Sequence, residues 1–443
     1  MTRDALLNQI RDAGVVGAGG AGFPTHVKLA CKADIVIANG AECEPLLRTD
    51  QQLLANHAET VLNGLALAMQ AVGAVQGVVA TKAHYHDAVA ALNAVLGKYP
   101  DIRLHEMQSY YPAGDEKSLI YEVTGRVVPT GKLPADVGAV VCNVNTLANV
   151  AHAAAQVPVT RKFVTVGGCV PSPATYEVPI GTDAMELLHC AGAPSDIAAD
   201  GYTLLVGGPC MGVLTKDFHL PITKTTGGLI LFPDTHAYVV RRSVSKHRQV
   251  TLAKAVCCQC SQCTQLCPRN ALGLKVQPHK AMRAVAQGMG GLLGDANAVL
   301  ACCSCGLCTN YACNFGLDPA GFMADLKVEL NRQGLRPVAE DNITADPSWA
   351  LKKVPVSRLI ARMGLKAYDL PAPVKATPVV SRVTISLRQH IGTAAEAVVM
   401  EGALVHEGDL IAAIPGGALG ANVHASLSGR VTRVDSDSIT LEA

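Results

Sequence analysis

The chain has 443 residues, of which 16% are charged, and its formal net charge is +1. This balance, without a basic stripe or a long run of like charges, argues against a nucleic-acid partner. No window approaches ~18 uninterrupted apolar residues, so we expect no membrane-spanning helix. At roughly 150 residues per domain, the length predicts two to four domains. The N-terminus lacks the basic-then-apolar pattern of a signal peptide, and we expect a cytoplasmic protein.

Strand-like and helix-like segments alternate over the first 156 residues. The expected helices are 4–12, 49–72 and 87–96, and the expected strands are 35–38, 77–81 and 102–106. Apolar residues recur at helical spacing in the 49–72 segment, whereas the strand segments are short β-type runs. Alternation of this kind is typical of parallel strands with crossover helices. We therefore predict a Rossmann-like domain over residues 1–156.

The rest of the chain changes character three times, so the fold class is multidomain α/β. Residues 157–245 combine expected strands at 162–166 and 203–206 with a helix at 183–189, which predicts a compact α+β module. The cysteine-rich region 246–335 predicts short helices and loops. Residues 336–378 form a proline-containing linker. Residues 379–443 are glycine-rich, and the segments 402–408 and 423–429 alternate like the strands of a small barrel.

Ten of the sixteen cysteines fall into two stretches with one pattern. The first stretch reads C-x2-C-x2-C-x3-C-P, the spacing by which bacterial ferredoxins bind cubane iron–sulfur clusters, and the second matches at its first three positions. In two-cluster ferredoxins the fourth cysteine of each stretch binds the other cluster. The expected ligands are Cys257, Cys260, Cys263 and Cys313 for one [4Fe-4S] cluster, and Cys302, Cys305, Cys308 and Cys267 for the other.

Two other uses of these cysteines fit the sequence less well. A disulfide framework requires a secreted context. Structural zinc uses two separated C-x2-C pairs, without a third cysteine and a Cys-Pro in the same run. The last spacing of the second stretch is x4 and no proline follows Cys313, so the pattern defines the first three ligands better than the fourth. Cys258 and Cys303 fit neither frame and are expected to be packed thiols.

A glycine-rich segment lies between the first expected helix and the first expected strand. Gly17, Gly19 and Gly22 match G-x-G-x-x-G, and Lys28 follows. A turn with so few side chains lets backbone N–H groups approach a phosphate or a flavin ring, and a lysine can meet the phosphate. The strand that normally precedes this motif is missing. The alternative is a glycine-rich turn that packs a helix against the sheet.

Three further motifs occur at residues 39–45 (Asn-Gly-Ala-Glu-Cys-Glu-Pro), 111–117 and 143–147. The first follows an expected strand, where open α/β sheets bind ligands. With the glycine segment, these motifs resemble the flavin- and NADH-binding subunit of respiratory complex I, and more closely the C subunit of the Rnf electron-transport complex. The resemblance implies FMN contacts from Gly17, Gly19, Gly20, Lys28, Asn39, Glu42, Asn143 and Thr146, and NADH contacts from Phe23, Glu44 and Glu116.

Two positions depart from the complex I pattern. Ala41 stands in place of an acidic residue and Cys142 in place of an asparagine, so two polar contacts to the flavin are not expected here. Glu42 and Glu44 also admit a plainer interpretation as residues of the turn alone.

The resemblance extends over essentially the whole chain. Residues 161–212 resemble the soluble-ligand-binding β-grasp module of these families, and the tail resembles their barrel-sandwich-hybrid module. No lysine occurs after Lys375, so this tail cannot be lipoylated or biotinylated. In the Rnf protein the barrel precedes the flavin domain, whereas here it follows the cysteine region. This order is similar to that of the cobalamin reductases of propanediol-utilisation bacterial microcompartments.

The resemblance implies an NADH-dependent cobalamin reductase that reactivates coenzyme B12. FMN would accept the hydride of NADH, and two [4Fe-4S] clusters, which take one electron at a time, would carry the electrons to cobalamin. The implied partners are NADH, cobalamin, an adenosyltransferase and shell proteins, and the implied location is the microcompartment interior. Two alternatives stay open. One is an Rnf-type component that passes electrons to a membrane complex and ferredoxin, and the other is a non-catalytic iron–sulfur conduit.

Overall fold

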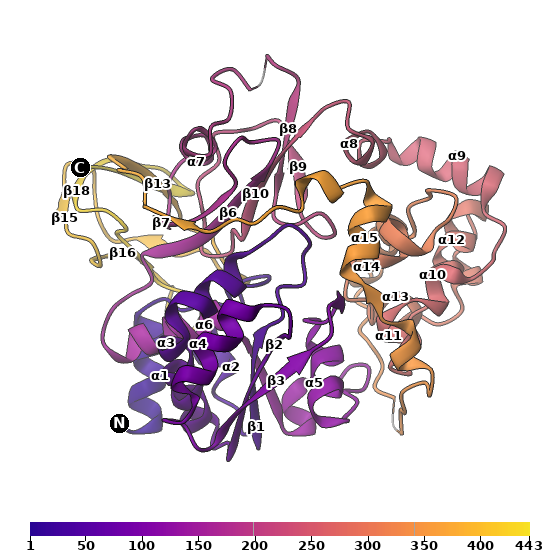
Figure 1. The fold of residues 1–443 in the computed structure, drawn as a ribbon, viewed down its shortest axis with the longest axis horizontal. Helices are drawn as coiled ribbons and strands as arrows, with labels where there is room; N and C mark the ends of the chain where they lie inside the picture. The colour runs from indigo at the N-terminus through magenta and orange to yellow at the C-terminus, as the bar shows by residue number, and fades with distance from the viewer. Residues whose placement is uncertain (198, 341) are drawn as a thin grey trace.

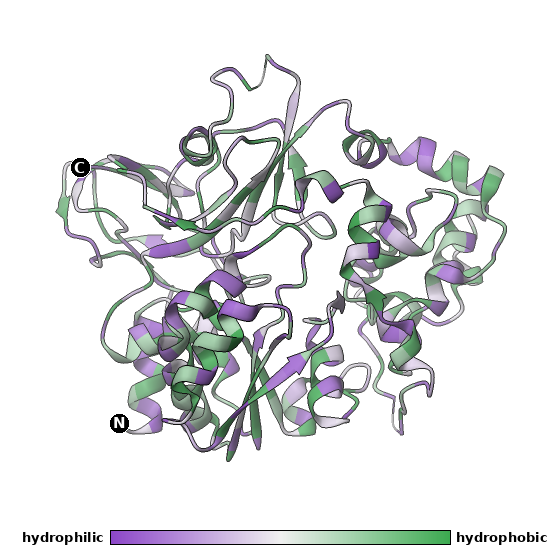
Figure 2. Ribbon diagram, in the orientation of Figure 1, coloured by the Kyte–Doolittle hydropathy of each residue, from purple (hydrophilic) through white to green (hydrophobic). Residues whose placement is uncertain are grey.

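The computed structural model describes residues 1–197, 199–340 and 342–443, and its first module is built on a parallel four-stranded sheet (Figure 1). The strands lie in the order β3-β2-β1-β5, and they are β1 (Ile35–Gly40), β2 (Gln76–Lys82), β3 (Ile102–Met107) and β5 (Ala139–Asn143). The three expected strands are confirmed, and β5 was not predicted. Almost every residue of β1 and β2 is buried, which is why these strands are continuous apolar runs. The edge strand β3 mixes hydrophilic and hydrophobic residues (Figure 2).

Helices cover both faces of this sheet, which confirms the Rossmann-like domain. The helices are α1 (Arg3–Asp12), α2 (Thr25–Lys28), α3 (Thr49–Val72), α4 (His86–Leu96), α5 (Glu116–Thr124) and α6 (Val144–Ala154). Apolar residues of α1, α3, α4 and α6 share one core, and those of α5 share a second core with the opposite sheet face. Gly64 lets α3 approach α6 closely, because a Cβ there would stand 1.8 Å from the Leu147 carbonyl oxygen.

The second module has the strand order of a β-grasp fold. Its sheet runs β12-β7-β6-β10-β8-β9, with β6 and β10 parallel at the centre. The helix α7 (Ala184–Cys190) shares a core with one face of the sheet. The strands are β6 (Arg161–Gly168), β7 (Ala174–Pro179), β8 (Tyr202–Val206), β9 (Val213–Thr215), β10 (Gly228–Pro233) and the later β12 (Val374–Lys375).

The cysteine region is helical, as expected. Two small apolar clusters hold its helices together, and both involve α12 and α14. The helices are α8 (Ala237–Arg242), α9 (Lys246–Val256), α10 (Gln262–Gln265), α11 (Pro268–Ala271), α12 (Pro278–Gln287), α13 (Asn297–Leu300), the π-helix η3 (Cys308–Ala312) and α14 (Pro319–Arg332). Short 3₁₀ turns complete the fold: η1 (Pro134–Val137), η2 (Gly290–Leu293), η4 (Trp349–Lys352) and η5 (Lys366–Tyr368).

The segment expected to be a linker, residues 336–378, contacts all three preceding modules. β11 (Val354–Pro355) pairs with β4 (Tyr110–Tyr111) of the first module, and α15 (Val356–Met363) packs beside η3. β12 then joins the β-grasp sheet beside β7. The segment, orange in Figure 1, therefore fastens the modules to one another as well as connecting them.

The C-terminal module is a small barrel of two sheets, β13-β19-β18-β15 and β14-β16-β17. The predicted segment 402–408 contains only two paired residues, because Gly402 and Gly408 lie in turns. The predicted segment 423–429 contains β17 and the first residue of β18. The strands are β13 (Arg382–Ser386), β14 (Glu396–Ala397), β15 (Leu404–Val405), β16 (Leu410–Ala413), β17 (Val423–His424), β18 (Gly429–Val434) and β19 (Ser438–Glu442).

The barrel is held to the N-terminal module by a buried lysine. Lys224, only 3% exposed, donates to the carbonyl oxygens of Gly14 and Asn422, both at 2.7 Å.

Among the residues that the structure describes, none of the helices is long and apolar enough to cross a membrane.

Candidate functional site

The motif residues meet where the strand order of the first sheet reverses. β1 pairs in parallel with β2 on one side and with β5 on the other. Within the β1–β5 pair, Asn39 is the direct register partner of Asn143, so the two motifs begin at the same level along the sheet. The carboxyl edge at such a switch point is where open α/β sheets bind ligands. The structure therefore brings the first and third motifs together at the position expected for a cofactor.

The glycine segment lies over this edge of the sheet. The Ala18 N–H donates to Thr146 Oγ1 at 2.9 Å, and a Cβ on Gly19 would stand 2.8 Å from Asn143 Nδ2. At Gly20, in contrast, no heavy atom of the described residues lies within 4 Å of the place a Cβ would take. The glycine loop is thus closely packed against Asn143 and Thr146 and open at Gly20. This geometry leaves room for a flat ring against the backbone.

Lys28 and Glu116 face each other across the site. Lys28 Nζ lies 2.7 Å from Glu116 Oε1, and both side chains are about one-third exposed. Burial alone would lower the pKa of Lys28, but the Glu116 carboxylate and the nearby thiol of Cys142 outweigh it and raise this pKa. Lys28 therefore stays protonated and provides a positive charge beside the carboxyl end of β5.

Asn39 and Asn143 hold the surrounding backbone. Asn39 Oδ1 accepts from the Ala41 N–H at 3.2 Å, and its Nδ2 donates to the Gly114 carbonyl at 3.0 Å. Asn143 caps α6 by accepting from the Asn145 N–H at 2.9 Å. These contacts join the 39–45 motif to the 111–117 motif and set the start of α6.

Glu42 caps α3. Its carboxylate accepts from Thr49 Oγ1 at 2.9 Å, from the Gln51 N–H at 3.3 Å and from the Asp50 N–H. Its backbone has a positive φ of 36°. Burial raises the pKa of this carboxyl group. The contacts match the plainer interpretation of Glu42 as a residue that organises the turn.

A buried group of charges under the glycine loop was missed by sequence reasoning. Asp50 accepts from Asn143 Nδ2 at 2.8 Å, and Lys162 of β6 donates to the Ala18 carbonyl at 3.1 Å. Burial and then the Glu42 carboxylate raise the pKa of Asp50, and burial lowers the pKa of Lys162 to about 8. The signal was a lysine at the start of an otherwise apolar strand. This group ties the β-grasp module to the glycine loop.

The three residues expected near NADH contact different parts of the site. Phe23 is 38% exposed beside the glycine loop, and Glu116 is paired with Lys28. Glu44 instead faces the β-grasp and cysteine regions, because it accepts from the Cys210 N–H at 2.8 Å. The Tyr111 hydroxyl approaches Glu44 at 3.4 Å and donates to the Cys305 carbonyl at 2.6 Å. Burial raises the pKa of Glu44 to about 7.

The two cysteine stretches have the same backbone geometry. Residues two and four positions after the first cysteine adopt a positive φ in both: Gln259 and Ser261 in one, Ser304 and Gly306 in the other. Gln259 Nε2 lies 3.2 Å from Cys257 Sγ, and the Ser304 N–H donates to Cys302 Sγ at 3.3 Å. Backbone segments that include left-handed residues form concave arrangements of N–H groups, which can stabilise an anion such as an iron–sulfur cluster.

The neighbours of each thiol also indicate how the stretches combine. Burial, and then the neighbouring thiols of Cys313, Cys260 and Cys257, raise the pKa of Cys263 to about 12. Burial raises the pKa of Cys267 as well, with further contributions from Cys303 and Cys302. Cys313 thus lies near the first stretch and Cys267 near the second.

The donor set suits cubane clusters. A cubane cluster takes one thiolate at each iron, so its four sulfurs stand apart. Cys258 is exposed, which makes the expectation of packing wrong for this residue, whereas Cys303 is partly buried.

A buried ion pair links the flavin-type module to the cysteine region. Arg269 binds Asp115 through two contacts of 2.6 and 2.9 Å, and the two side chains are 12% and 7% exposed. Asp115 caps α5 just before Glu116, and Arg269 follows Cys267 by two residues.

Comparison with known families assigns the modules. A Nuo51 FMN-binding domain matches residues 10–152, a 4Fe-4S dicluster domain matches residues 256–318, and an RnfC barrel sandwich hybrid domain matches residues 361–442. The chain is similar to the cobalamin reductase PduS of Salmonella typhimurium strain LT2, with 43% identity over 100% of this chain and 97% of that protein. The cobalamin reductase PduS of Citrobacter freundii is 42% identical over 98% of this chain and 96% of its own.

A more distant relative belongs to an ion-translocating complex. The C subunit of the Na⁺-translocating ferredoxin:NAD⁺ oxidoreductase complex of Acetobacterium woodii is 36% identical over 62% of this chain and 60% of that protein. Together, an FMN-binding module and a two-cluster region define a flavin and iron–sulfur oxidoreductase. Within that class, the chain belongs to the cobalamin reductase PduS family.

Glu44→Gln is expected to change how stability depends on pH. Because the pKa of Glu44 is raised from 4.5 to about 7, the native state binds more protons than the unfolded state between these values, and wild-type stability falls as pH rises through this range. At pH 5 the variant and the wild type should have similar free energies of unfolding, whereas at pH 8 the variant should be more stable by on the order of 2 kcal/mol. Anaerobic urea unfolding measures this difference. An equal difference at both pH values would contradict the buried carboxyl.

Proposed function

We propose that this protein is an NADH-dependent cobalamin reductase that moves electrons from FMN through two [4Fe-4S] clusters. The observation that carries the proposal is the direct attachment of the glycine-loop site to both cysteine stretches. Arg269, just after the first stretch, binds Asp115, and the Cys305 carbonyl of the second stretch accepts from Tyr111. Such attachment keeps a two-electron site and a one-electron site at a constant separation. The acceptor is inferred from the cobalamin reductases to which the chain is similar.

The FMN site is proposed at the carboxyl edge of β1 and β5. Gly17, Gly19 and Gly20 provide a backbone surface, and the open space at Gly20 fits a planar ring. The Lys28 ammonium has three donors and spends one on Glu116, so two stay available for a phosphate. Asn39, Asn143 and Thr146 hold the loop and the strand ends in place. Glu42 acts through Asp50 and the start of α3.

The NADH side is proposed along the outer edge of the glycine loop. The exposed ring of Phe23 offers a stacking surface for a base, and Glu116 can accept a hydrogen bond from a ribose or an amide. Glu44 lies deeper, beside Tyr111, and is proposed to contact the nucleotide from the side of the β-grasp and cysteine regions.

The eight cysteines are proposed to form two crossed clusters. Cys257, Cys260, Cys263 and Cys313 bind one, and Cys302, Cys305, Cys308 and Cys267 bind the other. The thiol neighbours of Cys263 and Cys267 support this assignment. The proposed boundaries are 1–156 for the flavin domain, 157–245 for the β-grasp module, 246–335 for the clusters, 336–378 for the linker and 379–443 for the barrel.

When bound, FMN and the two clusters would convert the two-electron donor into a source of single electrons. One NADH would balance the reduction of cobalt(III) to cobalt(I), with release of NAD⁺ and a proton. The residues of this chain bind and position these groups. Lys28 would bind the phosphate, and the closely packed backbone at Gly19 would help to exclude water. Arg269 would hold its guanidinium, paired with Asp115, near Cys267 and Cys303, where it would favour the reduced form of the adjacent cluster.

The proposed partners beyond NADH and cobalamin are an adenosyltransferase and the shell proteins of a propanediol-utilisation microcompartment. Reduced cobalt(I) is consumed by transfer of an alkyl group, so an enzyme that adenosylates it must act next. The proposed location is the cytoplasm, inside the microcompartment, and the similarity to a protein named cobalamin reductase PduS supports it.

Anaerobic purification tests the proposed function directly. We expect about eight iron atoms per chain, with one FMN and reduction of cob(III)alamin that depends on NADH and is followed by its visible absorbance. Flavin reduction by NADH without corrinoid reduction would contradict cobalamin as the acceptor. A protein that retains iron but no flavin would instead support a simple electron conduit.

Cys267→Ser tests the crossed ligands. If Cys267 closes the cluster of the second stretch, the variant should lose or convert that cluster while the one held by Cys257, Cys260 and Cys263 persists. Electron paramagnetic resonance of the dithionite-reduced protein distinguishes the two clusters. Cys258→Ser serves as the matched control and should keep the full iron content, because Cys258 lies outside the ligand frame. Loss of the first cluster in Cys267→Ser would show that the ligands are not crossed.

A further inference from the structure

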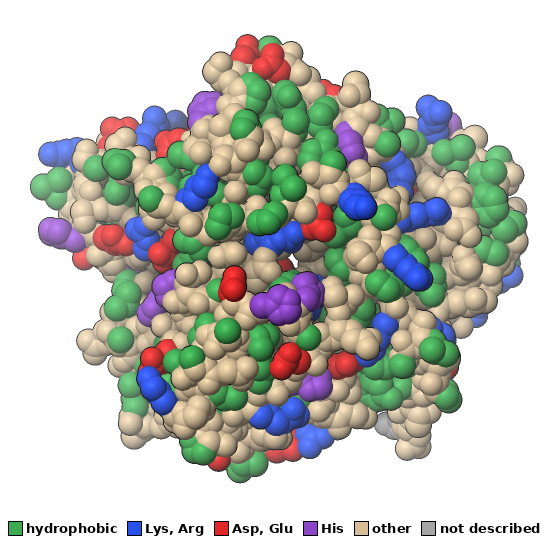
Figure 3. All heavy atoms as spheres, viewed as in Figure 1, with side chains coloured by type: hydrophobic (Ala, Val, Ile, Leu, Met, Phe, Trp, Pro, Cys, Tyr) green, Lys and Arg blue, Asp and Glu red, His purple; other side chains and the backbone are tan. Residues whose placement is uncertain are grey.

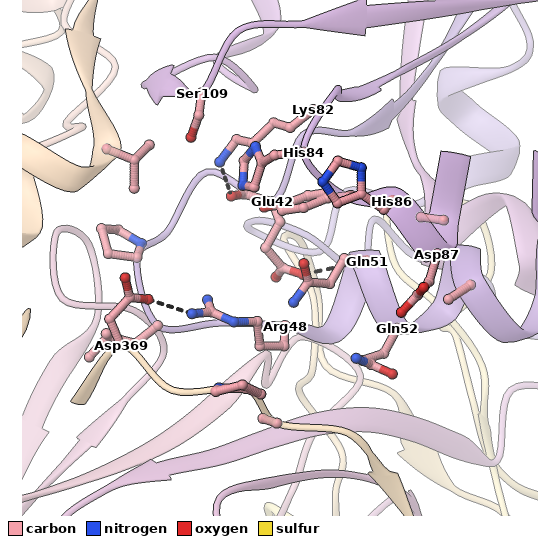
Figure 4. Close-up of a pocket in the computed structure, with 18 of the residues that line it drawn as sticks. Glu42, Arg48, Gln51, Gln52, Lys82, His84, His86, Asp87, Ser109 and Asp369 are labelled. Carbon is pink, nitrogen blue, oxygen red and sulfur yellow. Dashed lines mark hydrogen bonds and ion pairs between the residues drawn. The ribbon is translucent and has the colours of Figure 1, made fainter. Parts of the chain in front are cut away.

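A second site lies at the same edge of the sheet, on the β2–β3 side of the switch point. A cavity of about 980 Å³ opens between the carboxyl ends of β1, β2 and β3 and a roof made by α15 and residues 369–373 (Figure 4). Figure 3 shows a hollow in the middle of this face with histidine side chains beside it. Its size is at the upper end of the range for ligand pockets.

This cavity is separate from the glycine loop. Its lining shares Glu42 with the proposed flavin site and Glu44 with the proposed nucleotide side, so the cavity adjoins them, but it includes none of the described residues of the glycine segment. A nicotinamide must contact the flavin ring directly to transfer a hydride, so the cavity is poorly placed for the electron donor. An acceptor of single electrons needs no such contact. The position therefore favours the acceptor over the donor.

The cavity walls adjoin both electron-carrying regions. On one wall, Glu42 accepts from the Asp50 N–H, and the Asp50 carboxylate binds Asn143 at the flavin-type site. On the other wall, Glu44 lies beside Tyr111, whose hydroxyl binds the Cys305 carbonyl at 2.6 Å. Glu42 is thus two contacts from the glycine-loop site, and Glu44 is two contacts from a cysteine loop.

The polar lining matches a ligand with many amides and one phosphate. Gln51, Gln52, Gln108 and Ser109 offer amide and hydroxyl groups that can both donate and accept. Lys82, 2% exposed, spends one ammonium donor on the Glu42 carbonyl at 2.9 Å and points into the cavity (Figure 4). Two of its donors stay available for an anionic oxygen. A corrinoid combines a ring bearing amide side chains with a nucleotide loop that carries one phosphate.

We infer that this cavity is the docking site of the corrinoid acceptor. The inference rests on the proposed cobalamin reductase function and adds the place where the acceptor binds. The amide groups contact the ring periphery, and Lys82 contacts the phosphate. The roof from 369–373 and α15 closes over one edge of the ligand.

Two tryptophan substitutions from different strand ends would block the cavity. Ala83, after β2, and Gln108, after β3, are both exposed residues of its lining. Ala83→Trp and Gln108→Trp should each weaken binding of hydroxocobalamin to the anaerobic holoprotein at least tenfold in equilibrium dialysis. The ratio of cobalamin reduction to ferricyanide reduction, both driven by NADH, should fall at least tenfold as well. Ala90→Trp, exposed on α4 outside the lining, is the matched control and should leave both quantities within twofold of the wild type.

Three other outcomes would contradict the inference. Wild-type hydroxocobalamin binding in both blocked variants would exclude the cavity as the corrinoid site. Loss of NADH-driven flavin reduction with cobalamin binding retained would identify the cavity as a nucleotide site. A wild-type protein that binds no hydroxocobalamin would contradict the proposed function itself, and the docking site with it.

Discussion

The flavin-type module and the cysteine region meet at the buried ion pair of Asp115 and Arg269. Asp115 also caps α5, whose first residue, Glu116, pairs with Lys28 at the glycine loop. Arg269 follows the cluster ligand expected at Cys267. Removing one partner of such a pair leaves an uncompensated buried charge and costs about 3–5 kcal/mol. The ion pair therefore fixes the position of Cys267 relative to the glycine-loop module, and the proposed electron transfer between the flavin and a cluster bound by Cys267 would depend on that position.

Several weaker contacts also lie at the boundary between the flavin-type module and the cysteine region. Tyr111 binds the Cys305 carbonyl, and a Cβ on Gly306 would stand 2.7 Å from the Cys210 carbonyl oxygen. The backbone of the second cysteine stretch thus packs against both the first module and the β-grasp module. Lys162 and Lys224 extend the same principle to the glycine loop and the barrel. Buried lysines at module boundaries make the relative placement of the modules specific, because each requires its carbonyl acceptors.

Local patterns in the sequence predicted the local structure, whereas the contacts between modules could not be predicted from these patterns. The strands at 35–38, 77–81 and 102–106 follow from apolar runs, and the cysteine frame agrees with the left-handed residues at matching positions in both stretches. Arg269 and Asp115 are 154 residues apart, and Lys162 and Ala18 are 144 apart, so no periodicity links them. The barrel strands were too short and too interrupted by glycine to define from alternation. The cavity was not foreseen because its roof comes from the segment expected to be a linker.

The rest of the proposed electron path depends on the placement of FMN at the switch point between β1 and β5. The FMN content of anaerobically purified Gly20→Val tests this placement, because the new side chain would occupy the open space above the loop. Gly97→Val is the control, since its Cβ also meets no heavy atom of the described chain within 4 Å, far from the motifs. We predict that Gly20→Val retains less than about a tenth of the wild-type FMN, because the valine overlaps the ring, while its iron content and the FMN of Gly97→Val are unchanged. Wild-type FMN content in Gly20→Val would contradict the flavin site.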